Sequence, residues 1–156
     1  MLDLLKLRLR RQFFDSYGQR AREQQAKLAP RGIRFSCPAC GYPTLDCRAQ
    51  YDMCELCWWE DDGQDDDTAD EVWGGPNHDY SLTDARENFQ EYLVMYPPER
   101  DKRIGGPDSE QVRRIKRNLM DVFEKMIEEP IPRELDQFWE HARLLEQELD
   151  REEDLR

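Results

Sequence analysis

The sequence predicts an α+β protein in which one small cysteine-rich hairpin is combined with about four α-helices. Three observations predict this class. Two Cys-x-x-Cys pairs are separated by thirteen residues, four segments repeat apolar residues at helical spacing, and Pro or Gly follows several of the helical patterns. We expect an N-terminal helix over residues 1–32, a cysteine-rich ribbon with a loop and a helix over 33–96, and a helical hairpin over 97–156.

Residues 2–28 are expected to form a basic amphipathic helix, which ends at Pro30 and Gly32. The residues at helical spacing that make its apolar stripe are Leu2, Leu5, Leu9, Phe13, Phe14, Tyr17 and Ala21. Such a helix can lie on a membrane surface. Packing on acidic helices of the same chain is the simpler interpretation, and we favour it.

The two cysteine pairs stand in the pattern of a small ribbon over residues 33–59. Ile33–Phe35 leads into the first pair, and Thr44–Arg48 and Tyr51–Met53 have the composition of short strands before the second pair. Pro38 and Gly41 suit tight turns in which successive backbone N–H groups can point at the sulfur atoms.

Cys37, Cys40, Cys54 and Cys57 are the candidate metal ligands. Each pair sets two thiolates about one tight turn apart, and two such turns that face each other satisfy a tetrahedral zinc site. Disulfides and a redox dithiol are the alternatives. We see no secretory signal that would indicate an oxidising compartment, and a redox pair needs a βαβ setting, so structural Zn²⁺ is the expected cofactor of a zinc ribbon.

Four cysteine ligands close the coordination sphere and leave no position for water or substrate. The ion is therefore expected to stabilise the fold and to take no part in catalysis. The fifth cysteine, Cys47, has no partner at ligand spacing, and we expect it to be a small, half-buried strand residue.

Three further helices are expected after the ribbon. Ser81 opens the first with a capping-box pattern, and Pro97 stops it. Ser109 caps the second, which ends at Pro130, and the last begins at about Arg133.

Eight of the twelve residues from 60 to 71 are acidic. So many carboxylates repel one another, and we expect no regular structure there without a cation or a basic partner. A solvated loop is one alternative, and a Ca²⁺ site is another, although the spacing differs from that of an EF-hand loop. The expected partner-binding residues are Trp58, Trp59, Glu60, Asp61, Asp62, Asp65, Asp66, Asp67, Asp70, Glu71 and Trp73. For Trp58 and Trp59, burial beside the sulfur atoms is the stronger alternative.

The formal net charge of -12 is divided unevenly along the chain. Residues 1–34 carry nine basic and three acidic side chains, a balance of +6, so residues 35–156 carry a balance of -18. Such a surface repels nucleic acid and attracts basic proteins. No apolar run approaches the length of a membrane span, so we expect a soluble, cytoplasmic protein that binds another protein.

Several motifs accompany the cysteine pairs, namely Trp58-Trp59-Glu60-Asp61-Asp62-Gly63-Gln64-Asp65, Gly75-Pro76-Asn77, Ser81-Leu82 and Asn88-Phe89. With them, the stretch over about residues 35–95 resembles the bacterial CPCC-type cysteine-rich domain. That family usually has a third cysteine in its first pair, where this chain has Ala39. The four expected ligands are unchanged by this difference.

The resemblance implies a binding function, because members similar to this chain include immunity proteins that accompany secreted toxins. We expect an immunity protein that covers the active site of a cognate toxin. The expected partner is a nuclease with a basic active-site cleft. The alternatives are a zinc-binding regulatory or adaptor module and a metal-dependent enzyme that uses His78 with the carboxylates of Asp61, Asp62, Asp65 and Asp66. We expect no enzyme, since neither His78 nor His141 stands beside a Ser or Cys nucleophile.

Overall fold

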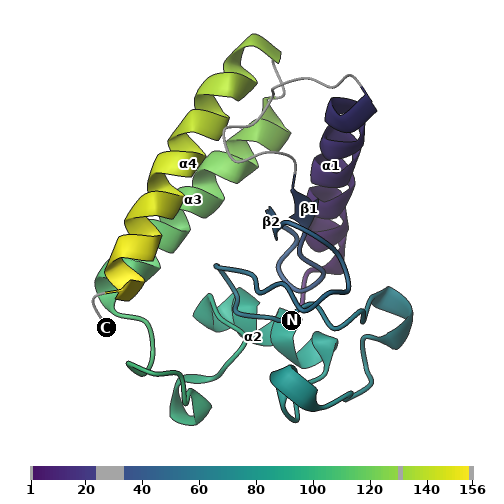
Figure 1. Ribbon diagram of the computed structural model, residues 1–156, viewed down its shortest axis with the longest axis vertical. Helices are drawn as coiled ribbons and strands as arrows, with labels where there is room; N and C mark the ends of the chain where they lie inside the picture. Colours follow the sequence, from purple (N-terminus) through teal and green to yellow (C-terminus); the bar gives the residue numbers. More distant parts are fainter. Residues whose placement is uncertain (1, 24–33, 130–131, 155–156) are drawn as a thin grey trace. The chain divides into compact units, whose positions relative to one another are not determined.

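The computed structural model describes residues 2–23, 34–129 and 132–154 (Figure 1). The chain divides into two compact units. The first unit consists of Met1–Gln19 and Arg34–Arg100, and the second of Arg20–Ile33 and Asp101–Arg156. In the described ranges the fold contains four α-helices and one two-stranded antiparallel sheet, which confirms the predicted α+β class.

Helix α1 (Leu4–Glu23) forms where a basic helix is predicted, but its buried face differs from the predicted stripe. Leu7, Phe14 and Ala21 are buried, whereas Leu5 and Leu9 are 70% and 51% exposed. The reason is the surface under the helix. Leu7 fits over a glycine of the ribbon, and that fit selects the inward face more strongly than the number of leucines does. The expected continuation to residue 28 lies outside the described residues.

The sheet is a hairpin that surrounds the first cysteine pair. Strand β1 (Phe35–Ser36) pairs with β2 (Pro43–Leu45), which covers the start of the predicted strand Thr44–Arg48. The predicted strand Tyr51–Met53 is reduced to one isolated bridge, between Met53 and Glu60, on either side of the second pair. The backbone segments on either side of each Cys-x-x-Cys turn therefore pair with each other, as strands at the first turn and as a single bridge at the second.

Helix α2 (Leu82–Tyr92) begins with the predicted capping box. The hydroxyl of Ser81 accepts the N–H of Asp84 at 3.0 Å, and the Asp84 carboxylate accepts the N–H of Ser81 at 2.9 Å. The helix ends earlier than Pro97 suggested, because Leu93 takes a left-handed conformation with φ 63° and closes the last turn.

In the second unit, α3 (Glu110–Glu128) and α4 (Pro132–Asp154) lie side by side as a hairpin (Figure 1). Ser109 caps α3 as predicted, since its hydroxyl accepts the N–H of Val112 at 3.1 Å. The buried apolar residues of the pair are Val112, Ile115, Leu119, Val122, Phe123, Met126, Leu135, Trp139, Ala142, Leu145 and Leu149. No helix in the described part of the chain combines the length and the apolar character that crossing a membrane requires.

A charged cluster is buried in this second unit. The ammonium of Lys116, which is 0% exposed, lies 2.6 Å from the carboxylate of Asp108. Arg103 pairs with Asp108 at 2.9 Å and with Asp101 at 2.7 Å. Burial acts to raise the pKa of Asp108, but Lys116 and Arg103 outweigh it and hold that pKa below the ordinary value. Burial also raises the pKa of Glu153 in α4.

Candidate metal centre

Two equivalent turns carry the four cysteines. In the first turn the N–H of Cys37 donates to the carbonyl of Tyr42 at 2.9 Å, and in the second the N–H of Cys54 donates to that of Trp59 at 3.0 Å. Cys40 and Cys57, the second cysteines of the pairs, are as fully buried as the first. The sequence places two ligands on each turn, and the backbone repeats the same hydrogen bond in both.

The four sulfur atoms have the spacing of a tetrahedral metal site. The Sγ atoms of Cys37 and Cys57 are 3.6 Å apart, those of Cys40 and Cys54 are 3.7 Å apart, and all four lie within 4.8 Å of one another. A tetrahedron with Zn–S bonds of about 2.3 Å has edges of about 3.8 Å. All four thiols are free, which excludes disulfides among them in this structure. The predicted ligand set is therefore brought together as one candidate metal site.

Hydrogen bonds to sulfur favour the thiolate form that a metal requires. The N–H of Ala39 lies 3.4 Å from Cys37 Sγ, the N–H of Cys57 lies 3.4 Å from Cys54 Sγ, and the hydroxyl of Thr44 donates to Cys54 Sγ at 3.0 Å. Although burial acts to raise it, the pKa of Cys54 is held well below its ordinary value by hydrogen bonds from neighbouring thiols and from the Cys57 backbone.

At the other sulfur atoms burial disfavours the thiolate form, and a bound cation would favour it. Burial raises the pKa of the Cys40 and Cys57 thiols well above the ordinary value, and the neighbouring sulfur of Cys37 adds to the effect. Several negative sulfur atoms in one buried space repel each other strongly. A bound divalent ion removes that repulsion, so the donor set fits a thiophilic metal.

Two arginines place positive charge around the first turn. Arg10 of α1 donates to the carbonyl of Cys40 at 3.3 Å and stacks over the ring of Tyr42, with its guanidinium carbon 4.6 Å from the ring centroid. Arg86 of α2 donates to the carbonyl of Pro38 at 2.9 Å. A divalent ion with four thiolates carries a net charge of about -2, and these two guanidinium groups would offset it.

The acidic run is held by basic residues of the same chain. Asp61, which is 0% exposed, accepts from the guanidinium of Arg48 at 2.7 Å. Asp65 accepts from Arg11 of α1 at 2.7 Å and from Arg48 at 3.0 Å, while Asp66 accepts from Arg86 at 2.7 Å. The sequence suggested that the run needs a cation or a basic partner to become ordered. The partner of these three carboxylates is internal.

A short helical turn follows within the run, at Asp66–Thr68. The carboxylate of Asp65 accepts the N–H of Asp66 at 2.8 Å, and the hydroxyl of Thr68 accepts the N–H of Asp65 at 3.1 Å. The buried amide of Gln64 donates to the carbonyl of Thr68 at 2.9 Å and to that of Glu71 at 2.8 Å. The run is therefore a closed, hydrogen-bonded loop, and the basic partners that the sequence called for are arginines of the same chain.

Burial separates the predicted partner-binding residues into two groups. Trp59 and Asp61 are 0% exposed and cannot contact a partner in this conformation, which corrects their assignment to a binding surface. The residues that are half-buried are Trp58, Glu60, Asp62 and Asp65. The exposed residues are Asp66, Asp67, Asp70, Glu71 and Trp73. For Trp59 the structure supports the alternative in which the ring is part of the core next to the cysteines.

The residues of the alternative enzyme site lie in different surroundings. Asp61 and Asp65 face guanidinium groups, and His78 is exposed on a turn with φ 55°. The buried Asn77 is structural, because its amide accepts the N–H of Glu60 at 3.0 Å and donates to the carbonyl of the same residue at 2.7 Å. Among the described residues, the four cysteines are the group positioned to share a metal ion.

Sequence reasoning missed the arginines that organise the site. Arg11, Arg48 and Arg86 come from three separate segments, and only folding brings them to the acidic run. Thr44 and its bond to Cys54 were also missed. The available signal was the excess of arginine before the first cysteine in a chain that is otherwise acidic. Cys47 is half-buried as predicted, but in a bend after β2.

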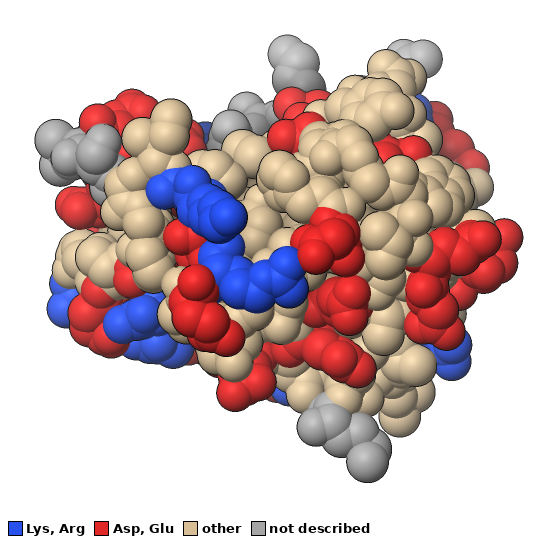
Figure 2. All heavy atoms as spheres, turned by 90° about the horizontal axis from the view of Figure 1, so that it is seen from below, with Lys and Arg blue, Asp and Glu red and all other residues tan. Residues whose placement is uncertain are grey.

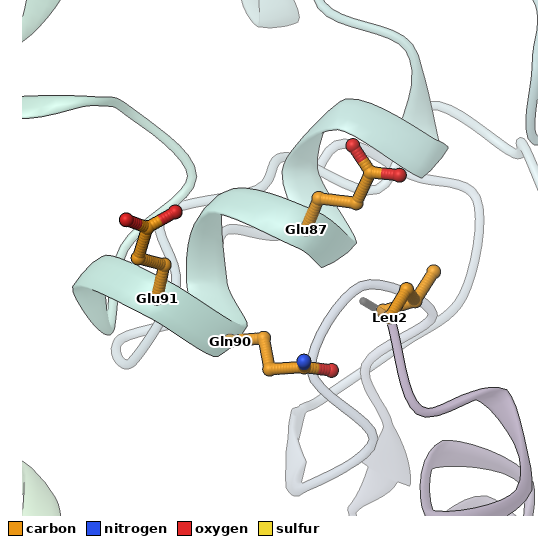
Figure 3. A pocket seen from close by; sticks show the side chains of 4 residues that line it. All are labelled: Leu2, Glu87, Gln90 and Glu91. Carbon is orange, nitrogen blue, oxygen red and sulfur yellow. The ribbon is translucent and has the colours of Figure 1, made fainter.

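A separate pocket in the first unit is lined by Leu2 and by Glu87, Gln90 and Glu91 of α2 (Figure 3). The side-chain oxygen of Gln90 accepts the N–H of Asp3 at 2.8 Å. The pocket offers two like-charged carboxylates one helical turn apart and no thiol or histidine among its lining side chains. On the molecular face drawn in Figure 2, acidic side chains are more widespread than basic ones.

Comparison with known proteins agrees with the geometry of the centre. No curated protein and no solved structure matches the chain. Residues 35–110, which include all four cysteines and the whole acidic run, match the model of the family described as cysteine-rich CPCC, and this stretch of the chain is thus similar to that family.

Proposed function

We propose that this protein is a zinc-stabilised binding protein of the immunity type, which neutralises a basic toxin, such as a nuclease, by covering its active site. In this proposal the metal is structural. Four buried thiolates with tetrahedral spacing suit Zn²⁺, with iron as the main competitor. A closed sphere of four protein ligands gives the metal no open position for chemistry.

One observation carries the binding function: the exposed carboxylates of the acidic run belong to a loop that internal ion pairs hold in place. Asp67, Asp70 and Glu71 are exposed, whereas the neighbouring Asp61 and Asp65 are fixed by internal arginines. A loop that is already ordered before binding loses little conformational entropy when it binds. Exposed carboxylates of one sign also accelerate association with a basic protein and can take the places of phosphates in a nuclease cleft.

The experiment begins with capture of partners from a lysate of the native organism, followed by assay of any captured nuclease with the purified protein. The test variant is Asp67→Asn/Asp70→Asn/Glu71→Gln. The control variant is Asp121→Asn/Glu128→Gln/Asp136→Asn, which removes the same charge from exposed positions of α3 and α4. We expect the test variant to slow association on the order of tenfold at low salt and the control to change it little.

Two results would count against the proposal. Equal effects of both variants would mean that net charge, and no particular loop, governs association. Binding of a partner whose activity is unchanged would favour the adaptor or regulatory alternative, in which the same loop docks the protein without inhibition.

A further inference from the structure

Four large apolar side chains remain exposed in two segments of the first unit, residues 51–53 and residues 72–73. Tyr51 is 61% exposed, Met53 41%, Val72 55% and Trp73 49%. Exposed apolar residues that gather in one place, with polar residues at their border, are typical of protein interaction sites. The four residues are called the Trp73 surface below.

The backbone contacts place these residues on adjoining segments. The N–H of Tyr51 donates to the carbonyl of Asp61 at 2.9 Å, the N–H of Asp61 donates to the carbonyl of Asp52 at 2.9 Å, and Met53 forms a bridge with Glu60. Tyr51 and Met53 therefore stand on the segment that pairs with residues 60–61.

Trp73 joins the same region through Gly63. A Cβ built on Gly63 would lie 3.8 Å from Cζ3 of the Trp73 ring and 3.6 Å from the Cβ of Ala49. Both Ala49 and Gly63 donate backbone N–H groups to the Asp61 carboxylate, at 2.7 and 3.3 Å. The indole ring thus lies against backbone that is fixed by the Asp61 carboxylate, which also pairs with Arg48, and about half of the Trp73 residue still faces solvent.

The border of the Trp73 surface is negative. Glu71 and Asp70 directly precede Val72 and Trp73, and both are exposed. The carbonyl of Glu71 is held by the buried amide of Gln64, which fixes where this acidic pair stands relative to Trp73. An apolar centre with carboxylates beside it is complementary to a segment that has an apolar side chain flanked by Lys or Arg.

We propose that Tyr51, Met53, Val72 and Trp73 form the docking surface for a basic segment of a partner protein, in which a large apolar side chain packs on the Trp73 ring and flanking Lys or Arg side chains pair with Asp70 and Glu71. This inference deepens the proposed function, since it names the chemistry of the partner's contact segment. Tryptophans of this kind, half exposed and rigidly supported, frequently dominate binding energy.

The test is selection from a phage-displayed library of random peptides on the full-length protein loaded with zinc. We expect selected peptides that combine Lys or Arg with one large apolar residue. Their affinity should fall on the order of tenfold or more in Trp73→Ala and be largely kept in Trp73→Phe. Leu144→Ala is the matched control, because Leu144 of α4 is also 50% exposed and lies in the second unit.

Thermal unfolding of each variant shows whether Trp73→Ala still folds. If it does not, the double variant Asp70→Asn/Glu71→Gln replaces it as the test. We expect this variant to bind the peptides more weakly than wild type at low salt, and we expect the difference between the two proteins to disappear at high salt. No enrichment, enrichment of acidic peptides, or equal affinity for wild type and Trp73→Ala would overturn the proposal. The result is separate from the proposed function: peptides that bind at Trp73 in a protein that inhibits no toxin would leave this surface assigned and reject immunity.

Discussion

Gly41 and Trp58 occupy the same position in the two cysteine turns. Each directly follows the second cysteine of its pair, each has a left-handed backbone, with φ 84° and 70°, and each donates its N–H to the carbonyl of the first cysteine, at 2.8 and 2.9 Å. Their surroundings differ. A Cβ on Gly41 would lie 2.9 Å from Leu7 of α1, whereas the second turn accommodates a whole indole group. A left-handed backbone favours glycine in both turns, and crowding by Leu7 adds a second reason for glycine in the first turn.

Gly41→Ala should destabilise the protein by about 2 kcal/mol, from left-handed strain and from crowding against Leu7. Urea denaturation at neutral pH measures the change. Gly106→Ala is the control, because Gly106 has φ 75° but no atom within 4 Å of the added Cβ. Equal losses in both variants would show that α1 does not press on the turn.

Removal of the metal should lower stability by several kcal/mol, and Cys54→Ser should have a similar effect. The physical reason is that four buried thiols then lose their common cation. Metal analysis should find one zinc per chain, and thermal unfolding with and without a chelator should show the loss. Cys47→Ser should change neither result, since Cys47 is not in the ligand group. Equal stability of the two forms would reject a structural metal.

Asp65→Asn should cost about 1 kcal/mol at pH 7, a modest value because the carboxylate is 35% exposed. The hydrogen bond from Arg11, opposed by burial and aided by Arg48, holds the pKa of Asp65 well below its ordinary value. The folded-state pKa is thus lower than the unfolded value of about 3.9, so the contribution is complete above that pH and is lost as the pH falls towards the folded-state pKa.

The measurement is the difference in unfolding free energy between wild type and Asp65→Asn at several pH values. We expect the difference to shrink below about pH 4. Asp67→Asn, at an exposed neighbouring position, should give little difference at any pH. A difference between wild type and Asp65→Asn that stays constant down to pH 2 would contradict the ion pairs.

Asp108→Asn should destabilise the helical hairpin by about 3 kcal/mol, because it removes the carboxylate charge that lies 2.6 Å from the buried ammonium of Lys116. Lys116→Met should cost much less, since Asp108 keeps Arg103 as a partner at 2.9 Å. Guanidinium denaturation of the two variants tests the order. A larger loss of stability in Lys116→Met than in Asp108→Asn would contradict this prediction. It would mean that the Lys116 ammonium stabilises the hairpin through more than its ion pair with Asp108.

The features that the sequence predicts correctly are those with local causes. The ligand set follows from spacing, and the caps at Ser81 and Ser109 follow from side chains that bond to the next turn of the chain. The buried stripe of α3 follows from its period, as at Ile115 and Leu119. In each case the interacting residues are close in sequence.

The features that could not be predicted depend on distant residues. Arg11 meets Asp65 across 54 positions, and Arg86 meets Pro38 across 48. Nothing near Asp61 in sequence indicates that its carboxylate is buried. The buried face of α1 was predicted incorrectly for the same reason. Leu7 packs against Gly41, which is distant in sequence and has no side chain to block this contact.

The helix before the first cysteine is physically part of the cysteine-rich module, although the family match begins at residue 35. Asp15 of α1 accepts both the N–H and the hydroxyl of Ser36 at 2.8 Å, in addition to the Arg11 bond to Asp65. A clone that started at residue 35 would remove the hydrogen-bond partners of Ser36 and one ion-pair partner of Asp65, and it would expose the first cysteine turn to solvent. Boundaries drawn from the family match would here cut through a folding unit, and an expression plasmid should keep the preceding helix.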